Sequence, residues 1–197
     1  MTVLLANVAK GQESDKPFHI GVGIGPSFLP GINDADSLGG SPGVGLNLHL
    51  LDAGYAIGKR FGITLSWVGG AHVFHAKFYQ PSNGGDPFIL EDKHTIKYGL
   101  VAIGPMYTFH ITDRSFIDLK ARVGRFYAGE KVNSTNYSME QNTWSLGYSA
   151  GASYRLTLTS HFYVSAAADY ASGKFEANRN VARLHVVNLN VGVGVQF

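Results

Sequence analysis

The chain has 197 residues, a formal net charge of +2 and only 15% charged residues, against about 25% in ordinary soluble domains. The near balance of charges argues against nucleic acid as a partner, and the absence of cysteine excludes disulfides and cysteine-based catalytic or metal sites. Mean hydropathy is +0.00, and no apolar run approaches the ~18 residues that a membrane helix needs. A chain this poor in charge, with interrupted apolar segments, is predicted to cross a membrane as a closed β-barrel.

The N-terminal segment 1–16 is expected to lie outside the folded domain. It begins with a short apolar run and small residues but lacks the basic region of a full secretory signal, and residues 10–16 are polar. We expect a signal remnant or a flexible tail here, followed by a single barrel domain over residues 17–197.

Eight segments in the rest of the chain alternate apolar and polar residues with the period of two that is typical of a β-strand. They cover residues 17–28, 44–57, 61–78, 94–109, 116–127, 143–156, 162–171 and 184–197. The alternation shifts near Leu51–Asp52, which predicts a β-bulge. Pro105 predicts a local irregularity in the fourth strand, because proline cannot donate to a ladder. The expected fold class is therefore all-β, an eight-stranded antiparallel up-and-down transmembrane β-barrel.

The connections between these strands alternate strictly between short and long. Three are short (58–60, 110–115 and 157–161) and four are long (29–43, 80–93, 128–142 and 172–183). Bacterial outer-membrane barrels have short periplasmic turns and longer extracellular loops. We therefore expect both chain termini on the periplasmic side of the outer membrane and four extracellular loops.

The final strand carries the clearest signal. One of its faces is polar, and the other is apolar and ends on an aromatic residue: Leu189, Val191, Val193, Val195 and Phe197. A strand embedded in lipid needs such a stripe, with the aromatic at the interface. A soluble lipocalin-like barrel would also alternate, but it would turn its apolar face inward. Here the polar face is mostly Gly, Ser, Asn and Thr, and aromatics gather near both strand ends, which favours the membrane-embedded arrangement.

With these features in view, the chain resembles the small outer-membrane β-barrel proteins of Gram-negative bacteria, the OmpA/OmpX-like barrels. The resemblance rests on the eight strands within residues 17–197, the Val-Gly-Val-Gln-Phe ending, and Gly104-Pro105-Met106-Tyr107 followed by segment 116–124. The final strand is also similar to the C-terminal signal that the barrel assembly machinery recognises. The resemblance implies contact with outer-membrane lipids and lipopolysaccharide. It leaves the activity open, because such barrels include adhesins, structural anchors, narrow channels and lipid-modifying enzymes.

Charged residues at predicted inward positions are the strongest candidate site. They are Asp52, Lys97, Asp118, Lys120, Arg122, Arg155 and Asp169. The lumen of an eight-stranded barrel is only wide enough for side chains to fill, and buried charges must pair. We expect an ion-pair network that plugs the barrel, and the alternative is a gated conduit that uses the same charges.

The predicted long loops are the candidate binding surface, because recognition residues concentrate on loops that a rigid scaffold carries. The aromatic and charged candidates there are Phe88, Glu91, Asp92, Tyr137, Glu140, Phe175 and Arg179. Arg125 falls on the lipid-facing stripe near the outer end of its strand, from where it could reach lipopolysaccharide phosphates.

No arrangement of residues predicts an enzyme, a metal site or a cofactor. His72 and His75 fall on opposite faces of a strand, and Ser160–His161 falls in a predicted periplasmic turn, away from the outer leaflet where lipid-modifying barrels work. We therefore expect a monomeric, non-enzymatic barrel with a plugged polar interior and a structural or adhesive role through its loops. A narrow passive channel is the first alternative and an outer-leaflet lipid-modifying enzyme the second, and the sequence does not identify the extracellular ligand or envelope partner.

Overall fold

The computed structural model describes residues 17–31, 42–80, 88–134, 138–177 and 180–197, apart from the side chains of residues 76–80, 88–91, 176–177 and 180–181. Residues 1–16, on which the expected signal remnant or tail falls, lie outside the described residues. Within the described ranges, no helix is long and apolar enough to cross a membrane.

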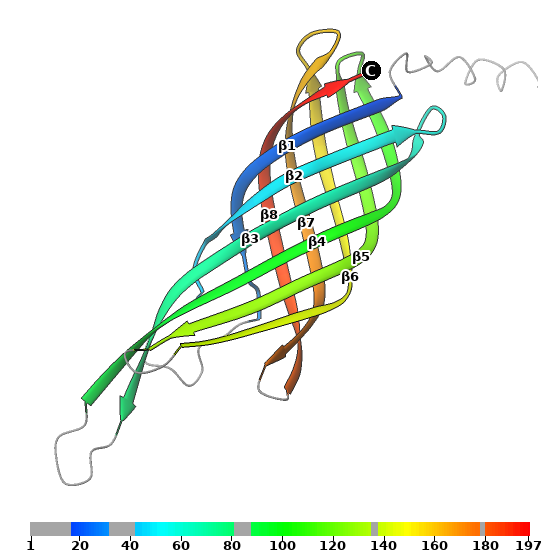
Figure 1. The fold of residues 1–197 in the computed structure, drawn as a ribbon. Coiled ribbons are helices and arrows are strands. Elements are labelled where there is room, and N and C mark those ends of the chain that lie inside the picture. The colour runs from blue at the N-terminus through cyan, green and yellow to red at the C-terminus, as the bar shows by residue number, and fades with distance from the viewer. Residues whose placement is uncertain (1–16, 32–41, 81–87, 135–137, 178–179) are drawn as a thin grey trace, which may run out of the picture.

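Eight antiparallel strands follow one another around a closed ring (Figure 1). They are β1 (Phe18–Phe28), β2 (Gly45–Ala56), β3 (Phe61–Gln80), β4 (Phe88–Thr112), β5 (Ser115–Asn133), β6 (Ser138–Thr157), β7 (Phe162–Ala177) and β8 (Asn180–Gln196). The last strand pairs with the first and closes the ring, from His19 opposite Gln196 to Phe28 opposite Val187. The predicted up-and-down barrel is confirmed.

The barrel turns its apolar side chains outward over the part nearest the chain's C-terminal residue. In β8, Val191 is 65% exposed, whereas its neighbour Asn190 is buried. The same parity holds around the ring and gives an apolar belt that includes Val22, Ile24, Leu46, Leu48, Ile63, Leu65, Trp67, Val101, Ile103, Leu119, Val123, Leu189 and Val193. Successive strand residues point to opposite faces, so this belt leaves the polar partners inside.

A β-bulge in β2 positions one of the predicted inner charges. His49 and Asp52 are paired with Gly23 and Gly21, so two residues of β2 lie opposite one residue of β1. Leu50 is also skipped in the pairing of β2 with β3. The bulge predicted near Leu51–Asp52 is thus present, and because it adds one residue it leaves both His49 and Asp52 on the inner face.

Pro105 disturbs the barrel less than a bulge would. The register between β4 and β5 is the same before and after it, since Ile103 lies opposite Val123 and Met106 opposite Lys120. Gly104 and Pro105 have no partner on β5 at this point, while Pro105 remains opposite Ile63 of β3. The expected irregularity is therefore confined to two missing pairs on one side of β4.

The two ends of the barrel differ. The short connections 57–60, 113–114 and 158–161 lie at one end, together with the C-terminal residue, and we call this the turn end (Figure 1). The opposite end, the loop end, carries residues 29–31 and 42–44 and the tips of the long strands. β3 to β6 have 20, 25, 19 and 20 residues, whereas about 9–11 tilted residues cross a bilayer. These strands therefore continue well past the belt at the loop end, as β3 and β4 do visibly in Figure 1.

The prediction of long loops at 80–93, 128–142 and 172–183 is wrong. Strand pairing continues to Gln80 opposite Phe88 in the first hairpin and to Asn133 opposite Ser138 in the second, and β7 and β8 pair as far as residues 177 and 180. Past the belt the alternation of these strands is inverted, with inner residues such as Ile96 and Leu184 apolar and outer residues such as Lys97 and Arg183 charged. A search for outward apolar stripes does not detect such strands.

Candidate functional site

The structure brings six of the seven predicted inner charges together inside the turn-end half of the barrel. Three are carboxylates and three are cations, so their formal charges cancel: Asp52, Asp118, Asp169, Lys120, Arg122 and Arg155. They come from β2, β5, β6 and β7, so the network joins strands on opposite sides of the ring. Closed charge balance of this kind is what a buried ionic cluster requires.

Asp118 is the most enclosed member of this network. Its carboxylate is fully buried and accepts two hydrogen bonds from the Arg155 guanidinium, from Nε at 2.6 Å and from Nη2 at 3.0 Å. The hydroxyls of Thr108 and Ser153 donate to the same carboxylate at 2.7 and 3.4 Å. A two-point arginine contact is both stronger and more directional than a single ion pair.

Asp52 and Asp169 share the remaining two cations. Lys120 Nζ donates to Asp52 at 2.7 Å, and Arg122 bridges the two carboxylates with one nitrogen to each, both at 3.2 Å. Arg122 Nε also donates to Thr64 Oγ1 at 3.3 Å. Each charge therefore has at least one opposite charge as a direct partner, which offsets part of the cost of removing it from water.

Lys97 is the exception, and its prediction as an interior residue is wrong. Ile96 and Tyr98 are buried inside the barrel, so Lys97 between them points outward and is exposed. Both faces of β4 are apolar over residues 100–103, with Leu100 inside and Val101 outside. Hydropathy alone therefore does not reveal the parity of this strand.

Aromatic and histidine side chains close the space beside the charges at the turn end. The Tyr163 ring lies over Gly21 and Gly194, where a Cβ atom would collide with it. The Arg155 guanidinium lies 5.8 Å from the centre of this ring, and His19 meets it edge-on at 6.1 Å. The absence of side chains at Gly21 and Gly194 thus leaves the space that this ring occupies.

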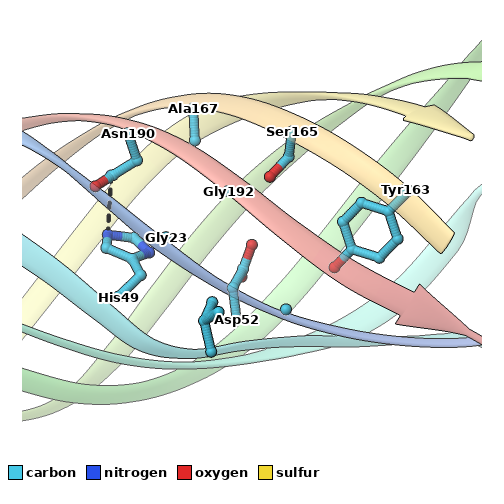
Figure 2. Close-up of a pocket in the computed structure, with 10 residues that line it drawn as sticks. Gly23, His49, Asp52, Tyr163, Ser165, Ala167, Asn190 and Gly192 are labelled. Atoms are coloured by element: carbon cyan, nitrogen blue, oxygen red, sulfur yellow. Dashed lines mark hydrogen bonds between the residues drawn. The ribbon is translucent and has the colours of Figure 1, made fainter. Parts of the chain in front are cut away.

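A small cavity remains beside the ion pairs. Asp52, Ser165 and Tyr163 line it, and Asn190 donates to His49 Nε2 across one side at 3.0 Å (Figure 2). Its free volume is about 10 Å³, which is room for roughly one water molecule. This lining is polar, so a water there would find hydrogen-bonding partners.

An apolar zone fills the barrel toward the loop end, where a polar interior was expected. Its buried members are Leu29, Val68, Ile96, Tyr98, Leu100, Ala102, Phe126, Ala128, Ala171, Leu184 and Val186, with Phe74 and Phe175 packed against them. The Phe126 ring lies against Gly147 and Gly173, which have no side chains to exclude it. The predicted plugged polar interior is thus correct for the turn-end half only.

A buried serine–histidine pair ties the first connection to this zone. The His72 ring lies 2.8 Å from Ser27 Oγ through Nε2 and 2.9 Å from the Pro42 carbonyl oxygen through Nδ1. A carbonyl oxygen only accepts, so Nδ1 carries the proton of this hydrogen bond. Ser27 and His72 are both fully buried, so no substrate can approach this pair in the observed structure.

The predicted loop residues are not gathered on one surface. Asp92 is buried on the inner face of β4, so the prediction that it contacts a ligand is wrong, and Phe175 is half-buried against the apolar zone. Glu140 is exposed on β6. Phe88 and Glu91 belong to β4 but their side chains lie outside the described residues, as do Tyr137 and Arg179 altogether. The prediction for Asp92 fails because a strand was taken for a loop.

The outer face at the loop end carries cationic side chains that were not among the predicted loop binding residues. Arg125 points outward as predicted, and its guanidinium lies 5.0 Å from the centre of the Trp144 ring. Lys97 and Lys131 are outward neighbours on β4 and β5. In the described part of the chain, no group of three or more histidine and acidic side chains is placed to hold a metal ion.

The whole chain, residues 1–197, matches the family model of the outer membrane protein beta-barrel domain. The chain belongs to this family of outer-membrane β-barrels. Its apolar belt therefore faces the acyl chains of the outer membrane, and the filled lumen is the interior of a membrane protein. No curated protein matches the chain by sequence.

Three solved structures match the chain at low sequence identity. Neisserial surface protein A (NspA) is 15% identical, with a TM-score of 0.51, over 95% of this chain and 100% of that one. Ail, the attachment invasion locus protein of Yersinia pestis, is 19% identical, with a TM-score of 0.48, over 91% of this chain and 96% of that one. The N-terminal β-barrel domain of Pseudomonas aeruginosa OprF is 11% identical, with a TM-score of 0.42, over 94% and 100%. The NspA match shows a shared fold, and we derive no function from it.

Proposed function

We propose that the protein is a sealed, monomeric and non-enzymatic barrel that holds a strand-built platform above the outer membrane as a binding or adhesive surface. The observation that carries this proposal is the filled lumen. Between the turn end and the loop end, side chains occupy the interior first as paired charges and then as an apolar zone.

The two zones oppose conduction by different means. An ion crossing the turn-end half would have to separate Asp118 from Arg155 or Arg122 from its two carboxylates. In the apolar zone it would lose its hydration shell among Leu100, Phe126 and Val186. Moving an isolated charge into such surroundings costs on the order of tens of kcal/mol. This argues against the narrow passive channel.

Planar-bilayer recording of the purified barrel tests the seal. We expect no steady single-channel openings in about 1 M KCl, a salt concentration at which small conductances are measurable. Regular openings of one amplitude from the folded protein would overturn the sealed lumen and favour the passive channel.

The platform consists of the strand extensions of β3 to β6, which rise above the belt at the loop end. We place the loop end outside the cell and both termini in the periplasm, because bacterial barrels carry their short turns on the periplasmic side. The apolar zone fills the barrel at the base of the extensions and anchors them there, so they can present an outer surface beyond the lipid. The final strand, with Val191 and Phe197, would serve the assembly machinery as its recognition signal.

An adhesion assay tests the platform. A non-adherent bacterial strain that produces the protein is compared with the same strain producing a variant in which residues 76–92 are replaced by a short Gly-Ser turn. We expect adhesion to an epithelial monolayer to fall to the level of the empty strain, with equal amounts of folded barrel in the outer membrane. Unchanged adhesion would show that the β3–β4 extension is not the binding surface.

The lipid-modifying alternative finds little support in the described residues. Ser27 and His72 are enclosed in the barrel, and Ser160 and His161 form their 2.8 Å contact at the turn end. In the proposed orientation the turn end faces the periplasm, so neither pair meets an outer-leaflet lipid. Mass spectra of lipid A after overproduction should be unchanged, and a loss or gain of acyl chains would contradict a non-enzymatic role.

A further inference from the structure

The ladder between β1 and β8, which closes the barrel and which we call the seam, is interrupted at one point. The two strands pair in a single register from His19 to Phe28 of β1, but Gly25 and Pro26 have no partner on β8. By this register Pro26 lies opposite Leu189. The seam therefore has a local gap, with regular pairing on both sides of it.

Pro26 causes this gap because it lacks the N–H that the ladder needs at its position. Phe18 and Phe197 exchange both of their backbone hydrogen bonds, at 3.3 and 2.9 Å. In an antiparallel pair such positions alternate with positions that exchange none, so every second residue of β1 counted from Phe18, Pro26 included, directs its backbone polar groups toward β8. Another residue at this position would donate to the Leu189 carbonyl oxygen, and proline cannot.

The side chain of Asn47, from β2, fills the gap from inside the barrel. Asn47 is fully buried, and its Nδ2 donates to the Leu189 carbonyl oxygen at 3.3 Å, in place of the missing N–H. The same nitrogen donates to the carbonyl oxygens of Gly25 at 2.9 Å and Pro26 at 2.7 Å. The two hydrogens of one amide group are thus shared among three carbonyl oxygens of the first and last strands.

A second side chain of β2 also reaches β8 across β1. His49 and Asn190 are both buried, and Asn190 Nδ2 lies 3.0 Å from His49 Nε2 (Figure 2). Beneath this contact Gly23 of β1 lies opposite Gly192 of β8. Two opposed glycines make no side-chain contact with each other, so the inner face of the seam is held here by a link from β2 directly to β8.

The similar gap beside Pro105, between β4 and β5, is bridged differently. There the two strands are joined by their own inner side chains, since Thr108 of β4 donates to Asp118 of β5 at 2.7 Å. At the seam the inner positions on the turn-end side of the gap are glycines, as Gly23 and Gly192 show. The tie must therefore come from a third strand.

On its other side, β1 is also held loosely at this level. The bulge in β2 sets two residues of that strand opposite Val22, which interrupts the ladder between β1 and β2. The small cavity beside Asp52 adjoins the same part of β1 and has Gly21 and Gly23 in its lining. Residues 21–26 of β1 thus have an interrupted ladder on each side and a cavity on their inner face.

We infer that the seam is the joint at which the barrel opens, and that Asn47 and His49 form a clasp across it that holds the last strand to the first. Both side chains come from β2 and reach β8 on the lumen side of β1, so the clasp acts only when the ring is closed. It supplies hydrogen bonds where Pro26 removes one from the backbone ladder. Closure of the ring is a property of the fold alone, so it is independent of the proposed function and of the orientation in the membrane.

Hydrogen–deuterium exchange of the full-length barrel in phospholipid vesicles measures this opening strand by strand. In Asn47→Leu/His49→Leu, amides of residues 19–28 and 187–196 should exchange about 25-fold faster than in the parent, because each of the two lost hydrogen bonds changes an opening equilibrium by roughly a factor of five. Amides in the continuous β5–β6 ladder should exchange as before. The control Thr64→Val removes another buried polar group, from a strand that is paired on both sides, and should leave the seam unchanged. Unchanged exchange at the seam of the clasp variant, or equal acceleration in every strand, would overturn the clasp.

Two further variants keep the test decisive if the double variant does not fold. Pro26→Ala restores an N–H opposite Leu189, so Asn47→Leu should accelerate seam exchange about twofold or less in this background, against about fivefold in the parent. An equal effect of Asn47→Leu in both backgrounds would contradict its role as a substitute donor. Val22→Cys/Val193→Cys places a disulfide across the seam, because these residues are directly opposed at a Cα separation of about 5.5 Å, within the range that a disulfide spans. Added to the clasp variant, the oxidised disulfide should restore the parent's folding and slow exchange, and continued fast exchange at the seam would show that the opening lies elsewhere.

Discussion

Removing the charge of Asp118 tests the interior network most sharply, because this carboxylate is fully buried and takes part in four hydrogen bonds. In an Asp118→Asn variant the Arg155 guanidinium keeps its charge and loses its ionic partner. At an effective dielectric constant of about 20, two unit charges about 4 Å apart attract by ~4 kcal/mol. Breaking a buried pair from one side costs about 3–5 kcal/mol, so the two figures agree.

The assay is urea unfolding from phospholipid vesicles, followed by tryptophan fluorescence and repeated in both directions to show reversibility. We expect Asp118→Asn to lower the free energy of unfolding by about 3–5 kcal/mol. Asp118→Leu/Arg155→Met replaces both charges by apolar groups and should lie within about 1 kcal/mol of the parent or above it. Asp113→Asn, in the exposed two-residue turn between β4 and β5, should change stability by less than about 0.5 kcal/mol.

Two results would refute this reasoning. A loss below about 1 kcal/mol for Asp118→Asn would mean that the site is hydrated like a surface. A double variant as unstable as the single one would mean that the loss comes from packing around Asp118 rather than from the charge left on Arg155.

Two further predictions follow from the same structure. Val191→Arg should lower the free energy of unfolding by about 2–4 kcal/mol in the same assay, because this outward position lies in the belt. Ser134→Arg, at the tip of β5 and β6, should lower it by almost nothing. Equal losses in the two variants would contradict the placement of the belt. Phe126→Ala should cost about 3–5 kcal/mol, because the ring is fully buried against Gly147 and Gly173, and a cost near zero would show that the apolar zone is loosely packed.

How much the sequence predicts depends on whether lipid constrains the strand. Within the membrane an outward residue must be apolar, so the parity of β5 follows from Leu119 and Val123, and it places Asp118, Lys120 and Arg122 inside. The change of parity at Leu51–Asp52 likewise predicts the bulge that turns Asp52 inward. These features need only local alternation, which the sequence displays directly.

Beyond the membrane this constraint ends, and the predictions fail there. The outward positions of the extensions carry Lys97 and Lys131 while the inward ones carry Ile96 and Phe126, the alternation of a water-soluble sheet. Where the two patterns meet, both faces of β4 are apolar, so hydropathy does not show which of its residues point inward. The apolar zone begins at this crossover, so only the strand register reveals it.

The account depends most on the apolar face meeting lipid, and Trp67 reports this directly. Trp67 is half exposed on the outer face of β3, six residues from Phe61 at the turn-end rim, which corresponds to roughly 14 Å of membrane depth for a strand tilted by about 45°. In a Trp144→Phe variant reconstituted in vesicles, phospholipids brominated in the middle of their acyl chains should quench its fluorescence strongly, and aqueous iodide should not. Quenching by iodide with no effect of the brominated lipids would contradict the account.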